Sequence, residues 1–508
     1  MEGREKEYRE ANEEIRLGES VKEEMRQTLA RRTVVRRYRR IAAAVCAAAM
    51  IVVLTVTGVL DGVLASLGLS GTMNALAAAE YPDIPLDDWQ WRWDFREQQG
   101  DYSDELVESM KLFARDSAVL VLGQETDKNL CYSPASLYTA LAMTAEMAGG
   151  ETRQEILEAL HYVYPQGVMS PVLKSAGKEI SHPIPSLADD MYRYLTLTYQ
   201  KGLTATTQIA NSLWINSEML DRGDLCQTTA DLLAEKYMVS TYLRDFRKKS
   251  TEKDMSDWVL QYTKGLLGGR EGDFQLGEST AMTLLSTVYY FEEWTDRFDK
   301  SRNVIEPFYQ ADGTTVNAEY MCVTHNPYAV LAREGYTAAG LSTKGRGQIT
   351  FILPDEGYTP ADILADESMM AEILAIGGEP EMEYAEVRFK VPKFQFWSEM
   401  DLTEPVKQLG ITGAFSPMEA DFSGILEADD SHPAPGSGGI WISGIRQQTT
   451  MSVDERGVEA SAYIELQYAG AAMPEDRIIE FTLDRPFIIL IENAGPLFIG
   501  VIQTPSIP

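Results

Sequence analysis

The sequence predicts an α+β fold with large antiparallel or mixed sheets, because helical and strand-like segments are separated along the chain. Apolar residues recur at helical spacing mainly in the first half, at 104–122, 134–148, 151–160, 223–237 and 251–267. Strand-like runs dominate afterwards, at 281–291, 348–353, 383–397, 440–454 and 478–502. Helices followed by strands favour this class over alternating βαβ units.

The length of the chain bounds its domain organisation, and its net charge excludes one class of partner. A chain of 508 residues exceeds the usual single domain, so we expect one large domain with an appendage, or two domains. The net charge is −32. Residues 1–40 hold 12 Lys/Arg against 9 Asp/Glu, a balance of +3, so the remainder carries −35. An acidic excess of this size repels phosphate backbones and argues against nucleic-acid partners.

The N-terminal region predicts a membrane anchor. Residues 41–60 contain no charge and are long enough to cross about 30 Å of hydrocarbon as a helix. Six arginines at 31–40 precede them, which predicts a cytoplasmic segment over 1–40 and an extracytoplasmic remainder. Secretion after cleavage at the small residues around Ala75 and Ala77 is the alternative. We favour the anchor because that site lies well beyond the apolar run.

Residues 61–101 have the composition of an extracytoplasmic linker. Trp89, Trp91 and Trp93 predict either an aromatic belt at the membrane interface or docking on the following domain, and docking is the simpler interpretation. The folded part is expected from Tyr102 onwards.

Residues 457–474, GVEASAYIELQYAGAAMP, alternate in polarity and then end in small residues. From Val458 to Tyr468 every second residue is apolar, the period of a strand with one buried face. The tip at 469–472 holds only Ala and Gly, which anchor a core weakly. An edge strand that runs into a loop would account for this pattern. That is the simpler interpretation, and a segment that is a loop in one state and a strand in another is the alternative.

Five blocks of sequence together resemble the serpin family. They are NLCYSPASLYTALAMTAEMAGGETRQEILEAL (129–160), YYFEEWTDRFD (289–299), the stretch from VPKFQFW to DFSGI (391–425), FTLDRPFIILI (481–491) and PLFIGVIQTP (496–505). The resemblance implies a serpin domain over 102–508, with about eight or nine helices and three β-sheets. It also identifies Asp484, Arg485, Pro486 and Phe487 as the family's C-terminal signature.

The same resemblance places 457–474 at the reactive-centre loop and implies a suicide-substrate mechanism. A serine protease cleaves the loop and forms an acyl-enzyme, and the freed loop then inserts into the central sheet as a strand. Insertion requires small or uncharged side chains in the hinge and apolar ones on the inward face. The implied hinge meets this requirement; it comprises Glu455, Gly457, Val458, Glu459, Ala460, Ser461 and Ala462. Tyr463, on the outward phase, is bulkier than expected.

Family spacing puts the reactive bond fourteen residues after Gly457, between Ala471 and Ala472. Small residues there suit elastase-like or subtilisin-like serine proteases. A trypsin-like enzyme finds no Lys or Arg between Gly457 and Pro474.

Polar residues under the implied sheet opening form a second group. The resemblance places Ser133, Ser136, Ser286, Trp294 and Gln447 there. Ser286 and Gln447 replace the asparagine and histidine of many serpins, but both still donate and accept hydrogen bonds. They form either a functional network or ordinary satisfied core polar groups.

Enzymatic functions are disfavoured. The four histidines, His161, His182, His325 and His432, lie near neither a Gly-x-Ser-x-Gly turn nor a paired metal ligand. Four dispersed cysteines, Cys46, Cys131, Cys226 and Cys322, predict neither a disulfide framework nor a zinc site.

We therefore predict no cofactor and no metal, and favour a membrane-anchored protease inhibitor of bacterial type. A non-inhibitory binding protein with the serpin fold and a membrane-anchored protease sensor are the alternatives.

Overall fold

The computed structural model describes most of the chain after residue 74. The described residues are 75–79, 81–84, 89–123, 128–162, 186–202, 204–222, 225–269, 274, 276–277, 280–345, 347–425, 440–458 and 477–505. The chain divides into two units, Met1–Thr72 and Met73–Pro508. The predicted cytoplasmic segment and anchor, 1–40 and 41–60, lie outside the described residues. Among those described, no helix is sufficiently long and apolar to cross a membrane.

Ten α-helices occur in the described part of the chain, against the eight or nine expected. They are α4 (Trp89–Gln99), α5 (Asp104–Leu122), α6 (Pro134–Met147), α7 (Gly150–Ala159), α8 (Leu187–Thr198), α9 (Gln227–Tyr237), α10 (Lys249–Tyr262), α11 (Pro360–Ala365), α12 (Glu367–Ile373) and α13 (Thr403–Gln408). One of the ten, α4, lies inside the segment 61–101 that was predicted as a linker. The second compact unit begins at Met73 and therefore includes this helix.

The α4 helix docks on the folded body through one face. Trp91 is half-buried and stacks on Phe95 at 5.6 Å, and the Phe95 ring lies 5.9 Å from Tyr192 of α8. Trp93 on the other face is 52 % exposed. The helix therefore docks through Phe95, on which Trp91 stacks from within α4, whereas the side chain of Trp89 lies outside the described residues.

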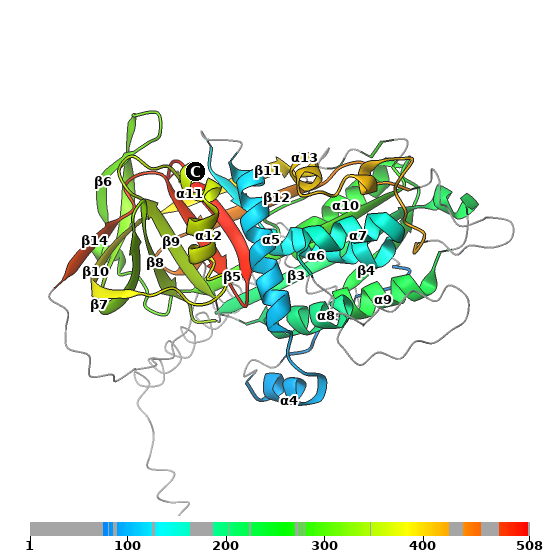
Figure 1. Ribbon diagram of the computed structural model, residues 1–508, viewed down its shortest axis with the longest axis horizontal. Helices are drawn as coiled ribbons and strands as arrows, with labels where there is room; N and C mark the ends of the chain where they lie inside the picture. Colours follow the sequence, from blue (N-terminus) through cyan, green and yellow to red (C-terminus); the bar gives the residue numbers. More distant parts are fainter. Residues whose placement is uncertain are drawn as a thin grey trace, which may run out of the picture. The chain divides into compact units, whose positions relative to one another are not determined.

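A nine-stranded sheet occupies one end of the body (Figure 1). Its strands are β1 (Leu130–Tyr132), β16 (Pro496–Ile502), β15 (Phe487–Glu492), β9 (Gln348–Pro354), β8 (Tyr336–Ser342), β7 (Thr315–Arg333), β10 (Glu383–Pro392), β14 (Ile478–Thr482) and β6 (Val304–Tyr309). The long strand β7 joins its two halves, because it pairs with β6 and β10 along most of its length and with β8 near its end.

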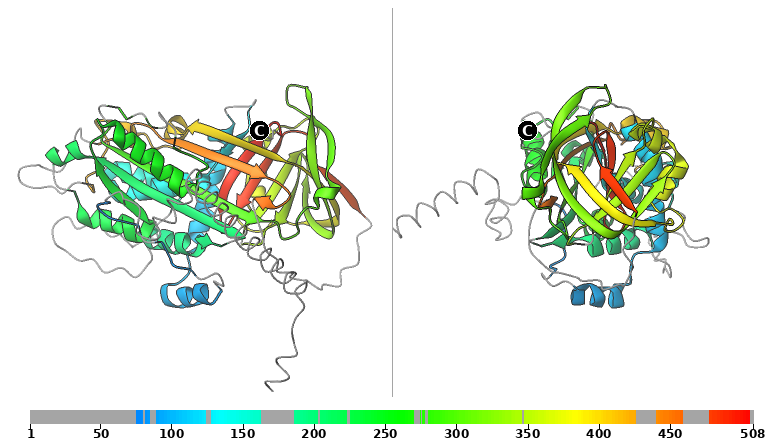
Figure 2. Two further views of the ribbon diagram at one scale, coloured as in Figure 1. Left: turned by 180° about the vertical axis from the view of Figure 1, so that it is seen from behind. Right: turned by 90° about the vertical axis from the view of Figure 1, so that its left-hand side faces the viewer.

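The remaining strands form a five-stranded and a two-stranded sheet. The first contains β13 (Gly457–Val458), β5 (Met282–Glu293), β3 (Ala205–Asn216), β2 (Gln200–Lys201) and β4 (Val239–Arg244). The second contains β11 (Phe394–Asp401) and β12 (Arg446–Val453). Figure 2 shows β11 and β12 beside the long strands of the first sheet.

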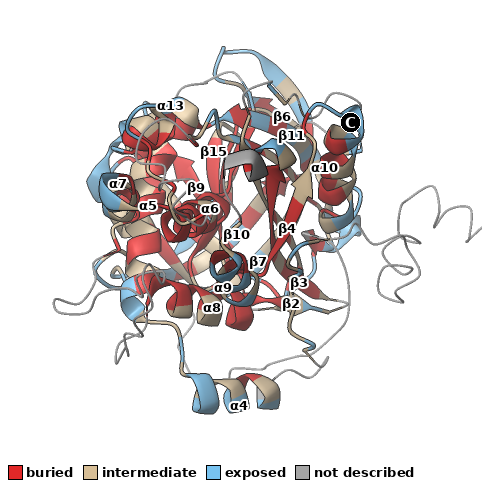
Figure 3. Ribbon diagram, turned by 90° about the vertical axis from the view of Figure 1, so that its right-hand side faces the viewer, coloured by how far each residue is buried: buried red, intermediate tan, exposed pale blue. Residues whose placement is uncertain are grey.

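Helix α6 lies in the centre of the body and is buried along almost its whole length (Figure 3). Ser133 caps its first turn by accepting a hydrogen bond from the backbone N–H of Ser136, and Pro134 occupies the first helical position. Small side chains such as Ala135, Ala142 and Ala145 let strands and helices approach it closely. The small-residue buried helix predicted at 134–148 is therefore confirmed.

Candidate functional site: an open sheet beside a loop hinge

The central feature of the site is a gap between strands β5 and β12. Among the described residues, no backbone pairing joins the two strands, and a cavity of about 270 Å³ lies between them. Residues 288–291 of β5 line one side and 449–452 of β12 the other, with Ile491 and Phe498 of the nine-stranded sheet also in the lining. Burial raises the pKa of Tyr290 well above its ordinary value, so its hydroxyl stays neutral in this lining.

The turn that follows helix α10 covers part of the gap. Thr263, Leu266 and Leu267 line the cavity from this turn. The ammonium of Lys264 lies 4.2 Å from the ring centroid of Tyr289 on β5, a cation–π contact. Thr263 ties the turn to the helix, since its hydroxyl donates to the carbonyl of Val259 at 2.7 Å.

Polar residues at the start of α6 connect both sides of the gap. Ser136 Oγ donates to Ser286 Oγ of β5 at 3.0 Å. Gln447 of β12 exchanges two hydrogen bonds with the backbone of Ser133, at 2.7 and 3.1 Å. Ser133 Oγ donates onward to the carbonyl of Leu497 at 2.8 Å. The four predicted polar residues thus form one network that holds β5 and β12 to the same helix.

Trp294 follows β5 and packs at the end of the gap where the hinge turn lies. Its side chain is 1 % exposed and its ring packs against Phe298 and Phe351. The indole Nε1–H donates to the carbonyl of Asp454 at 2.9 Å, and its backbone N–H donates to the carbonyl of Arg456 at 3.3 Å. Trp294 therefore holds the turn that leads from β12 into the predicted hinge.

Gly457 fits this turn because no side chain has room there. Its φ is +133°, which L-residues rarely adopt. A Cβ would meet three backbone atoms at 2.5, 2.6 and 2.7 Å, namely the Glu292 carbonyl oxygen, Glu293 Cα and Trp294 N. The close approach lets β13 pair with the end of β5, with Gly457 opposite Glu293 and Val458 opposite Glu292.

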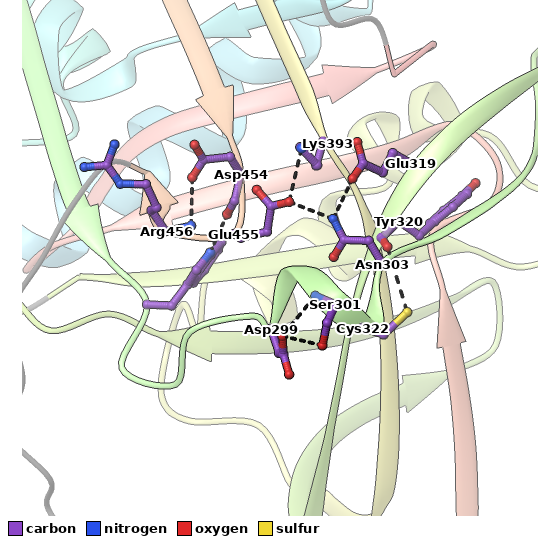
Figure 4. Close-up of polar contacts among 11 residues, drawn as sticks. Asp299, Ser301, Asn303, Glu319, Tyr320, Cys322, Lys393, Asp454, Glu455 and Arg456 are labelled. Carbon is purple, nitrogen blue, oxygen red and sulfur yellow. Dashed lines mark hydrogen bonds and ion pairs between the residues drawn. The ribbon is translucent and has the colours of Figure 1, made fainter.

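An ion-pair cluster holds Glu455 two residues before the glycine (Figure 4). Glu455 Oε1 accepts hydrogen bonds from Lys393 Nζ at 3.1 Å and from Asn303 Nδ2 at 2.6 Å. The same two residues also donate to Glu319, at 3.2 and 2.7 Å. Burial by itself would raise the pKa of Glu455, but its hydrogen bonds and the charge of Lys393 outweigh burial and lower the pKa below its ordinary value.

The signature residues lie away from the gap and connect strands. Arg485 donates to the Pro354 carbonyl at 3.0 Å and pairs with Asp484 at 2.9 Å. Phe487 starts β15 and is fully buried, packing on the ring of Phe351. Pro486 lies between them at the entrance to β15. Through Arg485 and Phe487 they attach the start of β15 to β9.

Part of the predicted site lies outside the described residues. This applies to Glu459, Ala460, Ser461 and Ala462 of the hinge and to the reactive bond Ala471–Ala472. Sequence reasoning also missed residues that matter here, namely Asn303, Glu319, Lys393 and Lys264. Only Lys393 carried a local signal, as a lysine between the apolar runs of β10 and β11.

Comparisons with known proteins agree with this architecture. The family model described as "Serpin (serine protease inhibitor)" matches residues 108–505. Plasminogen activator inhibitor 1 of Neovison vison is 25 % identical over 397 residues, which cover 75 % of this chain and 88 % of that protein. Serpin-ZX of Arabidopsis thaliana is 27 % identical over 391 residues, covering 75 % and 93 %.

Solved structures show the same fold. The thermophilic serpin Tengpin in its native state has a TM-score of 0.62 at 24 % identity, covering 85 % of this chain and 99 % of that chain. Human thyroxine-binding globulin in complex with its ligand has a TM-score of 0.61 at 23 % identity, covering 79 % and 100 %. A split central sheet with a hinge turn at its upper end defines the class, and the chain belongs to the serpin family. Its curated relatives are serpins such as plasminogen activator inhibitor 1, so the chain belongs to a family of protease inhibitors and not of enzymes.

Replacing Gly457 with alanine is expected to destabilise the hinge turn. The added Cβ meets rigid backbone and φ is unfavourable, so we expect a loss of about 2–4 kcal/mol in the free energy of unfolding measured with urea. Gly313→Ala is the matched control, because Gly313 also has a positive φ (+83°) but its Cβ would meet nothing within 4 Å. Equal losses in the two variants would contradict the steric account.

Acidification is expected to weaken the cluster around Glu455. A carboxylate with a lowered pKa stabilises the fold above its unfolded pKa of about 4.3, and this contribution disappears as the pH falls through the folded value. Glu455→Gln should therefore cost about 1–2 kcal/mol at pH 7, with the difference from wild type shrinking below about pH 4. Thermal unfolding across pH measures this. Glu480→Gln, in an exposed pair with Arg388, should change stability little at any pH.

Proposed function

We propose that this chain inhibits serine proteases as a suicide substrate, with residues 457–474 as bait and the gap between β5 and β12 as the place of insertion. The observation that carries the proposal is the pairing of Gly457–Val458 with the upper end of β5, at the mouth of the gap. Strand β13 begins there, and its pairing can be extended along β5 in the direction of Met282. Cleavage of the loop would release the chain end that otherwise prevents extension.

The register of β13 supports the predicted phase of the loop. If the pairing continues, Ala460 falls opposite Tyr290, Ala462 opposite Val288 and Leu466 opposite Leu284. These three β5 residues pack against the main core. Paired residues of antiparallel strands share a face, so the apolar set of the alternating segment would enter the core.

The polar residues of the alternating segment would face the side of the sheet on which α10 packs. Glu465 and Gln467 fall opposite Leu285 and Thr283 in the same register, and Leu285 packs with the α10 cluster rather than the main core. No charge would therefore enter the core. Each new backbone hydrogen bond would contribute about 1 kcal/mol net, which over about a dozen residues is large beside typical folding stabilities of about 5–15 kcal/mol.

The proposal also includes the class of target protease and the location of the inhibitor relative to the membrane. Cleavage between Ala471 and Ala472 would suit elastase-like or subtilisin-like serine proteases and exclude trypsin-like ones. The apolar run 41–60 would anchor the inhibitor outside the cytoplasmic membrane, in a bacterial-type arrangement with a cytoplasmic N-terminus. Secretion after cleavage near Ala77 is the alternative.

A non-inhibitory binding protein is the second candidate. Thyroxine-binding globulin, one of the structural matches, was solved with thyroxine bound, so this fold binds a small molecule in that protein. A membrane-anchored protease sensor, in which cleavage of the loop is transmitted to residues 1–40, is the third.

Covalent trapping tests the proposal directly. We expect incubation with an elastase-type or subtilisin-type protease to give a complex that survives boiling in detergent, and incubation with trypsin to give none by cleavage within 457–474. Cleavage without a complex, together with an unchanged melting temperature of the cleaved chain, would reject inhibition by insertion and favour the binding candidate.

Two adjacent substitutions test the phase of insertion. Leu466→Glu would bury a charge in the core at a cost of several kcal/mol, so this variant should be cleaved as a substrate and form at least about tenfold less complex. Gln467→Glu is the matched control and should inhibit like wild type, because its side chain would face away from the core. Equal inhibition by the two variants would refute the proposed register.

A further inference from the structure

An N-terminal strap, defined here as residues 75–79, 81–84 and 89–99, begins along the outer edge of the five-stranded sheet. Leu76 N–H donates to the Thr241 carbonyl at 2.7 Å, and Thr241 N–H donates to the Ala77 carbonyl at 2.8 Å. Ala79 N–H donates to Ser240 Oγ at 3.2 Å. The strap thereby pairs with β4, on the side of the sheet opposite the gap.

Tyr81 is the point at which the strap contacts other elements. Its ring lies 5.7 Å from the ring of Tyr199, between α8 and β2, and 6.0 Å from that of Tyr262. Tyr262 is the last residue of α10 and packs 4.6 Å from Trp258 of the same helix. Tyr81 therefore joins the end of α10 to the junction of α8 and β2.

Arg92 of α4 gives the strap a second attachment. Its side chain is 1 % exposed, and its guanidinium donates to the carbonyls of Leu197 and Tyr199. These carbonyls lie at the end of α8. A buried guanidinium bonded to backbone acceptors is costly to release, so the strap is held at both ends. Figure 3 shows α4 beneath α8.

The strap contacts α10 immediately before the turn that covers the gap. Tyr262 is in contact with the strap, and the next residue, Thr263, lines the cavity between β5 and β12. Thr263 Oγ1 also accepts a hydrogen bond from Leu267 N–H at 3.0 Å, so the turn keeps its shape relative to the helix. Because residues of this turn line the cavity, we expect a strand that enters the gap to displace the turn, and Tyr262 connects the turn to the strap.

We propose that the strap is a latch: by holding the end of α10 through Tyr81, it keeps the turn over the gap and slows insertion of the loop after Gly457. This inference rests on the proposed function. The coupling is reciprocal, because a contact that stabilises the closed sheet must be weakened when the sheet opens. Insertion of the loop should therefore loosen the strap, which begins at residue 75, fifteen positions after the end of the predicted anchor.

Point variants of the full chain test the latch through the lifetime of the uncleaved state. This lifetime is read as the time over which the intact protein gains thermal stability at a fixed temperature. Tyr81→Ala removes the aromatic contacts and should shorten the lifetime about 2- to 10-fold. Tyr81→Phe keeps the ring and should behave as wild type. Tyr384→Ala, an equally large deletion at a residue 58 % exposed on β10, should also leave the lifetime unchanged.

Amide hydrogen exchange tests reciprocity without any variant. Protection at Leu76, Ala79 and Thr241 should fall after the loop of the wild-type protein is cleaved and inserted. Unchanged protection, or a Tyr81→Ala lifetime equal to that of wild type, overturns the latch. Wild-type protein that gains no thermal stability after cleavage contradicts the proposed function, and the latch fails with it. If the wild-type protein gains thermal stability after cleavage but Tyr81→Ala has the wild-type lifetime, only the latch is contradicted.

Discussion

A sheet with a vacant pairing position at its centre is the constraint on which the rest of the molecule depends. In the described part of the chain, β5 pairs fully with β3 on one side, but on the other only its last two residues are paired, with Gly457 and Val458. Backbone groups at such an edge gain from a partner strand. The fold must therefore hold the edge apart from β12 while keeping access to it from above.

The gap is secured from three directions by different chemistry. Hydrogen bonds from Ser133 and Ser136 hold both strands to α6 from the core side. The turn after α10 covers the opposite face through apolar side chains and Lys264. The ion pair between Glu455 and Lys393 holds the entrance. These contacts are local and modest, so under the proposed mechanism cleavage of the loop after Gly457 would be enough to change which arrangement is the more stable.

Local patterns in the sequence were sufficient for the parts of the site that depend on neighbouring residues. The Ser-Pro-x-Ser motif at the start of α6 is such a short-range signal, and the structure shows the helix cap that it predicts. The alternation after Gly457 is also a short-range signal, but beyond Val458 it stays a prediction, because the following residues lie outside the described part of the chain. Strand β3 was missed because buried polar residues such as Thr206, Asn211 and Ser212 interrupt its apolar pattern, although each side chain makes a hydrogen bond within the fold.

Contacts between residues distant in the sequence could not be predicted from local sequence patterns. Glu455 and Lys393 are separated by 62 residues, and Asn303 and Glu455 by 152. Residues 75–99 have the composition of a linker, yet they form part of the folded body because Arg92 and Tyr81 find buried partners about a hundred or more positions away. No periodicity within a single segment reports such partners.

If the loop inserts as proposed, the pairing of Gly457 with Glu293 also limits how the length of this loop can vary in evolution. Side chains on a strand alternate between its two faces, so one residue added or removed between Val458 and Tyr468 would exchange the faces of everything that follows. Glu465 and Gln467 would then point into the protein interior. A residue gained or lost after Tyr468 leaves the faces intact and only moves the site of attack. Insertions and deletions should therefore be confined to the second half of the loop, where changing target preference does not disturb the fold.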